Sequence, residues 1–105
     1  MLNIGPVLHR DDAVANKVTA LYSRAQARDY IDVHAALASG QYSGETLLRL
    51  AIEHDPGFEL NLFAQALLAL RRLPIAEFTA YGLTEDDITT LTDRLTAWAA
   101  DINAR

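Results

Sequence analysis

The sequence predicts a mainly α-helical fold, a bundle of about five helices preceded by a short N-terminal strand or extended arm. Apolar residues recur at intervals of three and four along most of the chain, which is the periodicity of helices that bury one face. Residues that start and stop helices separate these segments. The 105 residues are half hydrophobic and contain no cysteine, which predicts a single domain over 1–105 with one core and no disulfide.

The segment 2–8 is apolar but is interrupted by Gly5 and Pro6. Because proline cannot donate to a central sheet ladder, this segment is expected to be an edge strand or an extended arm. The first residues carry no basic stretch before an apolar run, so no signal peptide is expected.

Two helices are predicted next. Asp11 and Asp12 supply an N-cap for a helix that ends near Arg24. A second helix covers about 27–39 and ends at Gly40, a residue type favoured just after a helix. The apolar positions of the two helices are Val14, Val18, Leu21, Tyr22 and Ala25, followed by Tyr30, Val33 and Leu37.

Three further segments complete the chain. Ser43 caps a third helix, which ends at the turn sequence Asp55-Pro56-Gly57. A fourth helix has an apolar face from Leu60 to Leu68 and ends at Pro74. A short turn is expected at 77–81. Thr84 and Asp87 resemble a capping box that opens a last helix. Its apolar seam contains Ile88, Leu91, Leu95, Trp98 and Ile102, and would pack in a bundle or against a second copy.

Charge limits the expected partners. The net charge of −5 argues against nucleic-acid binding by the isolated chain, since phosphate neutralisation needs a basic face. The acidic excess lies entirely after His34, so a surface that handles phosphate would lie in the N-terminal third. No apolar stretch is long enough to span a bilayer, and a cytoplasmic protein without a membrane partner is expected.

The charged residues of the first two helices have simple structural interpretations. Lys17 is the only lysine, and it lies seven residues before Arg24 beside the apolar stripe, where both stems could cover apolar surface. Arg28, Asp29 and Asp32 are expected on the side of the second helix away from its apolar face. There Arg28 and Asp32 could form an exposed i, i+4 ion pair. A functional role requires Asp32 to face a site, which spacing alone does not decide.

The order of these residues resembles a known family. Lys17 followed by the Arg28-Asp29-x-x-Asp32 motif is similar to the third and fourth motifs of AbiEii/AbiGii-type nucleotidyltransferase toxins. The flanking sequences also resemble that family, in order at 4–9, 55–58, 72–74 and 80–82. The resemblance covers nearly the whole chain and corresponds to the C-terminal half of such a toxin.

The resemblance implies roles for individual residues. Lys17 would contact a nucleoside triphosphate and Asp32 would complete the catalytic site, with Arg28 and Asp29 in support. Arg24 would be a second phosphate contact, and Arg28 would also take part in binding the nucleotide. These residue types suit nucleotidyl transfer, which depends on positioning and on neutralising phosphate charge.

One family motif is missing. The Gly-Ser followed by Asp-x-Asp that holds Mg²⁺ in the family does not occur here, and the paired aspartates at 11–12 and 86–87 lie where helices begin. The N-terminal metal-binding half is therefore expected to be absent and the chain to be inactive alone. It carries no expected metal site or cofactor, whereas a complete enzyme would use Mg²⁺ and a nucleoside triphosphate. Expected partners are the missing nucleotidyltransferase half and an antitoxin.

Two alternatives remain at this point. The chain could be a non-catalytic interaction module that forms a homodimer through segment 2–8 or through the seam 88–102. It could instead be a ribonuclease of the HEPN type, whose loose Arg…His pattern is met by Arg28 and His34. Six residues place those two side chains about 120° apart on a helix, which is unfavourable for joint action. His9 and His54 have no partner at metal-ligand spacing.

Overall fold

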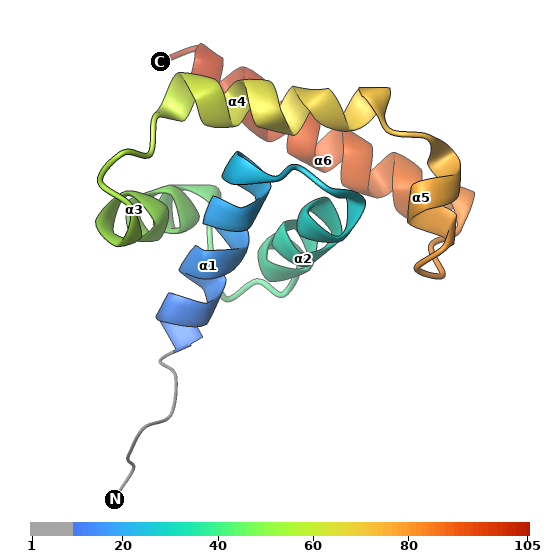
Figure 1. The fold of residues 1–105 in the computed structure, drawn as a ribbon, viewed down its shortest axis with the longest axis horizontal. Coiled ribbons are helices and arrows are strands. Elements are labelled where there is room, and N and C mark those ends of the chain that lie inside the picture. The colour runs from blue at the N-terminus through green and yellow to red at the C-terminus, as the bar shows by residue number, and fades with distance from the viewer. Residues whose placement is uncertain (1–9) are drawn as a thin grey trace, which may run out of the picture.

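Six α-helices and one 3₁₀ segment form the part of the chain that the structure describes, residues 10–105 of a computed structural model (Figure 1). The predicted arm at 2–8 lies outside the described residues. No strand occurs within 10–105, and the mainly α-helical prediction is confirmed. The elements are α1 (Arg10–Ser23), α2 (Ala27–Ala38), α3 (Gly44–His54), α4 (Leu60–Leu68), η1 (Ala69–Arg72), α5 (Ile75–Thr79) and α6 (Glu85–Asn103).

The predicted starts of α3 and α6 are confirmed by their caps, whereas Asp11 and Asp12, which were expected to cap the first helix, lie inside α1. The Ser43 side chain accepts a hydrogen bond from the Thr46 backbone N–H at the start of α3. At the start of α6, Thr84 and Asp87 form a reciprocal capping box. Each cap satisfies a backbone N–H that has no partner within its own helix, so these short polar residues decide where the helices begin.

The helices pack in two groups that share one core. In Figure 1, α4 lies along α6, and α1 is flanked by α2 and α3. The core contains large side chains from every α-helix, among them Leu21, Tyr30, Leu47, Phe63, Phe78, Leu95 and Trp98. The predicted seam of α6 is buried in this core from Leu91 to Ile102, so it packs within the bundle.

Two predictions about the segment after α4 were wrong in detail. Of the turn expected at 77–81, residues 77–79 are instead the end of a short helix, α5, which starts directly after Pro74 and buries Phe78, and a turn follows at 80–82. The fourth helix also changes to 3₁₀ geometry at Ala69, before Pro74. A proline favours the first turn of a helix that follows it and prevents the preceding helix from continuing. Helical periodicity does not reveal either change, because η1 has four residues and α5 has five.

The turn between α1 and α2 is only three residues long. Within it Ala25 has a φ angle of 53°, in the left-handed region that non-glycine residues seldom occupy. Tyr22, just before the turn, is tied to the loop after α3, because its hydroxyl donates to the Gly57 carbonyl and accepts from the Glu59 N–H. The relative placement of α1 and α2 is thus fixed by a short connection.

No helix within 10–105 combines the length and the apolar character that crossing a bilayer requires.

Candidate functional site

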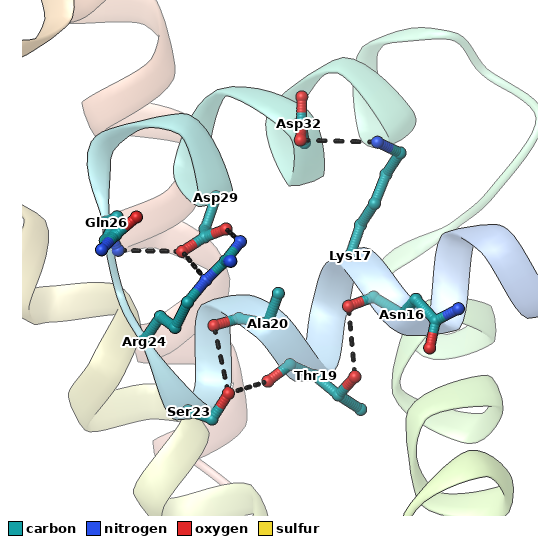
Figure 2. Close-up of polar contacts among 9 residues, drawn as sticks. All are labelled: Asn16, Lys17, Thr19, Ala20, Ser23, Arg24, Gln26, Asp29 and Asp32. Atoms are coloured by element: carbon teal, nitrogen blue, oxygen red, sulfur yellow. Dashed lines mark hydrogen bonds and ion pairs between the residues drawn. The ribbon is translucent and has the colours of Figure 1, made fainter.

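Lys17 on α1 and Asp32 on α2 lie side by side. The Lys17 Nζ atom is 3.4 Å from Asp32 Oδ2, and the two side chains are 45% and 38% exposed (Figure 2). Two residues that are fifteen positions apart in the sequence therefore meet because the short turn brings α1 and α2 together. The two side chains therefore converge, but neither of them lines any of the four cavities described in the structure.

This ion pair is weak in energetic terms. A solvent-exposed lysine–carboxylate pair contributes only about 0.2–1 kcal/mol to stability, because water competes for both groups. The ammonium can thus exchange the carboxylate for a phosphate oxygen at little cost. The Lys17 ammonium is partly exposed, and its charge is balanced by Asp32 in this arrangement.

Asp29 is buried, contrary to the prediction that it lies on the exposed side of α2. Its side chain is 2% exposed. It accepts hydrogen bonds from the Gln26 backbone N–H at 3.0 Å, from Arg24 Nε at 3.3 Å and from Arg24 Nη2 at 2.5 Å (Figure 2). The periodicity argument failed because Asp29 is in the first turn of α2, where it caps the helix and faces the end of α1.

Arg24 is engaged by this carboxylate. The hydrogen bonds to Asp29, and then its negative charge, raise the pKa of Arg24. A forked guanidinium–carboxylate contact is among the stronger side-chain interactions, and its two hydrogen bonds also restrict the relative orientation of the two groups. Arg24 and Asp29 together set the turn that brings Lys17 to Asp32. Figure 2 places the two contacts on neighbouring turns of the same α1–α2 junction.

Arg28 does not form the i, i+4 ion pair considered from the sequence. It is exposed, and within residues 10–105 it has no ion-pair partner, because Asp32 contacts Lys17 instead. The Arg28 guanidinium is available to an external anion.

Tyr30 is a structural residue of this region that the sequence marked only as apolar. Its ring is fully buried and its hydroxyl donates to the Ala66 carbonyl on α4 at 2.6 Å. Burial, together with the charge of Asp29, raises the pKa of Tyr30 to about 12. The hydroxyl therefore stays protonated and ties α2 to α4.

His34 has a different environment from a catalytic histidine. It is half-buried, and its Nε2 atom is buried without a hydrogen-bond partner in the described residues. Burial, and then the positive charge of Arg94, lower the pKa of His34. A general acid or base must reach its substrate, and Nε2 does not reach solvent in this arrangement.

A polar cleft of about 410 Å³ lies on α1, on the side of α3. It is lined by Asn16, Thr19, Ala20, Ser23, His54 and Asp55. The Thr19 and Ser23 hydroxyls donate to carbonyls of their own helix (Figure 2). Within residues 10–105 no group of three or more histidine or acidic side chains is arranged to hold a metal ion.

The comparisons with known proteins agree with the residue pattern. A family model described as nucleotidyl transferase AbiEii toxin, type IV TA system, matches residues 5–104. The match covers nearly the whole chain, so the resemblance inferred from Lys17 and the Arg28-Asp29-x-x-Asp32 motif is confirmed. No curated protein and no solved structure matches the chain significantly.

Proposed function

Because the chain belongs to the AbiEii family of nucleotidyl transferase toxins, we propose that it supplies the part of such an enzyme that contacts the nucleoside triphosphate. The observation that carries this proposal is the exposed Lys17–Asp32 pair across α1 and α2. The family description refers to a type IV toxin–antitoxin system, which implies an antitoxin partner.

In the proposed site Lys17 is the main phosphate contact. Its compact ammonium neutralises charge on a triphosphate oxygen, which is the principal electrostatic need of nucleotidyl transfer. Asp32 holds the ammonium in place while the site is empty and completes the catalytic site when the nucleotide binds. Arg28 is a second phosphate contact, since it is exposed and has no ion pair within 10–105.

Arg24 and Asp29 support this site in the proposal. Arg24 uses Nε and Nη2 to bind Asp29, and its half-exposed side chain keeps Nη1 available for a phosphate. Asp29 is too buried to touch a substrate, so its role is to position the turn. The distance between Lys17 and Asp32 then depends on Asp29 although Asp29 contacts neither.

The metal chemistry is assigned to another polypeptide segment. The Gly-Ser…Asp-x-Asp sequence does not occur in these 105 residues, and no described cluster of carboxylates replaces it. Mg²⁺ would therefore be held by a partner segment, and we propose that these 105 residues are inactive alone. Their own contribution is to bind and orient the triphosphate.

Nucleotide binding by single-residue variants tests the proposal. The chain would be titrated with each of the four ribonucleoside triphosphates and Mg²⁺ by calorimetry, as wild type and as Lys17→Ala. A charge-assisted hydrogen bond is worth about 1.5–3 kcal/mol, so the variant is expected to bind about 10- to 100-fold more weakly. Arg49→Ala is the matched control, because Arg49 forms another exposed ion pair, with Glu53 on α3.

Asp32→Asn separates binding from chemistry. It removes a carboxylate that competes for the Lys17 ammonium, so triphosphate affinity should be kept or increased. Transfer of label from the nucleotide, measured with a metal-binding segment added, should be lost. Equal affinities of Lys17→Ala and Arg49→Ala would contradict the proposed site.

The alternatives have less support. The α6 seam offered for a homodimer is buried against the rest of the bundle, so a dimer would need another surface. The ribonuclease interpretation needs a reactive His34, whose Nε2 atom is buried. Sedimentation at high concentration tests the homodimer. A comparison of RNA cleavage by wild type and by His34→Ala tests the ribonuclease interpretation.

A further inference from the structure

The turn between α1 and α2 contains a residue in an uncommon backbone conformation. Ala25 has a φ angle of 53°, in the left-handed region. In the described residues 10–105, the other positions with such an angle are glycines, Gly40 at 78° and Gly82 at 88°. Glycine adopts this region without steric cost, whereas alanine does not. Among these three turns, the α1–α2 turn alone uses a residue with a Cβ atom.

One carboxylate holds the residues on both sides of Ala25. Asp29 accepts a hydrogen bond from the Gln26 backbone N–H and two from the Arg24 guanidinium (Figure 2). Ala25 itself is half-buried and packs against the core. A strained backbone persists only where the surrounding structure determines its conformation. These contacts therefore keep the turn in its left-handed form.

The same turn affects the separation of Lys17 and Asp32. Lys17 lies seven residues before Arg24, and Asp32 lies three residues after Asp29. Core packing holds the buried faces of α1 and α2, but Lys17 and Asp32 lie at the exposed edge of this helix pair. The distance of 3.4 Å between Lys17 Nζ and Asp32 Oδ2 thus depends on the angle at which the connection joins the helices. Backbone freedom at Ala25 would change that angle.

We propose that Ala25 is a positioning residue of the triphosphate site, which acts through its restricted backbone and does not touch the substrate. The inference rests on the proposed function of Lys17 and Asp32. A Cβ atom at Ala25 reduces the number of conformations open to the turn, and the contacts of Asp29 select the left-handed one. Glycine would remove the steric cost but would leave more conformations open. Groups that are ordered before binding give a higher affinity than groups that must be ordered on binding.

Ala25→Gly tests the proposal, because glycine accepts a φ angle of 53° without steric cost and the variant should therefore fold. Ala80→Gly is the matched control. Ala80 is the exposed C-cap residue of α5 with a φ angle of −60°, so glycine there adds backbone freedom at a turn outside the α1–α2 junction. Ala25→Asn is the conservative variant, since asparagine accepts left-handed φ angles more readily than most residues and keeps a Cβ atom.

Three measurements separate positioning from stability. In thermal unfolding followed by tryptophan fluorescence, Ala25→Gly should melt at a temperature no lower than wild type, because the steric cost is removed. In NMR spectra recorded without nucleotide, the Overhauser contact between the Lys17 ε protons and the Asp32 β protons should weaken. Affinity for the ribonucleoside triphosphate that wild type binds best, measured by calorimetry, should fall by about two- to tenfold. Ala25→Asn and Ala80→Gly should match wild type in the NMR contact and in affinity.

Three results would overturn the proposal. Wild-type affinity and an unchanged Lys17–Asp32 contact in Ala25→Gly would show that packing alone places the two helices. A melting temperature that falls with the affinity would mean that Ala25 supports the fold in general. Equal losses of affinity in Ala25→Asn and Ala25→Gly would exclude the restricted backbone as the cause. Failure of wild type to bind any triphosphate would contradict the proposed function alone, because the NMR contact, measured without nucleotide, still decides whether Ala25 positions Lys17.

Discussion

At the scale of single residues, Asp29 both caps α2 and binds Arg24 at the end of α1. A carboxylate that is almost fully buried is tolerated only when its oxygens are hydrogen-bonded and its charge is balanced. Here one backbone N–H and the fork of Arg24 meet both needs. The same contacts close the turn that brings α1 to α2, so one residue links local capping to the geometry of the candidate site.

Replacing Asp29 tests this role. Asp29→Asn keeps the shape of the side chain but removes its charge, and charged hydrogen bonds are worth about 1.5–3 kcal/mol each. The free energy of unfolding in urea is expected to fall by about 2 kcal/mol. Glu53→Gln, at the exposed Arg49–Glu53 pair, should change it by less than about 1 kcal/mol. Similar losses for the two variants would contradict the structural role of Asp29.

His34 makes stability depend on pH. Burial and Arg94 lower its pKa in the folded state, so the unfolded chain binds a proton at higher pH than the folded chain does. Between the lowered pKa and about 6.5, the free energy of unfolding therefore falls as the pH falls. His34→Gln should reduce this dependence between pH 7.5 and 5.5, measured by urea denaturation. Arg94→Gln should reduce it as well, because one cause of the shift is removed; an unchanged slope in both variants would refute the assignment.

At the scale of helices, α3 and α6 meet at a position that excludes a side chain. A Cβ atom on Gly44 would lie 2.6 Å from Trp98 Nε1, far closer than van der Waals contact. Trp98 is buried and packs edge-on against Phe63, so its ring has little room to move. The first residue of α3 is thus limited to glycine by packing against α6.

Gly44→Ala is expected to destabilise the fold. Overpacking of a buried contact typically costs about 1–3 kcal/mol, and the shift of the indole should change the Trp98 emission. Gly57→Ala is the control, because a Cβ there meets only Asp55 Oδ1 at an ordinary 3.4 Å. Thermal unfolding of the two variants, followed by tryptophan fluorescence, distinguishes them. Equal melting temperatures would show that α3 and α6 can separate without cost.

The elements could be predicted where their signals are repeated or specific. The long helices have several turns of apolar spacing, and α6 also has the Thr84–Asp87 capping box. The five-residue helix α5 has too few turns to show a period, and its burial of Phe78 depends on neighbouring helices. The 3₁₀ segment η1 likewise depends on how the chain approaches Pro74. Elements of this kind are determined by packing and are not visible in one segment of sequence.

At the scale of the whole molecule, the candidate site depends on two helices that meet across a short turn. The residue types of Lys17 and Asp32 were identified through a family resemblance, and their contact followed once α1 and α2 were placed. The burial of Asp29 could not be predicted, because it arises where the end of one helix faces the start of the next.

The exposure of Lys17 has a practical consequence, because it is the only lysine among the 105 residues. An amine-reactive acylating reagent can modify only this side chain and the α-amino group, so intact-mass spectrometry would read its occupancy directly. A bound triphosphate should shield the ammonium and slow its acylation, while the α-amino group serves as the internal reference. A rate at Lys17 that is indifferent to nucleotide would mean that the ammonium stays in water throughout.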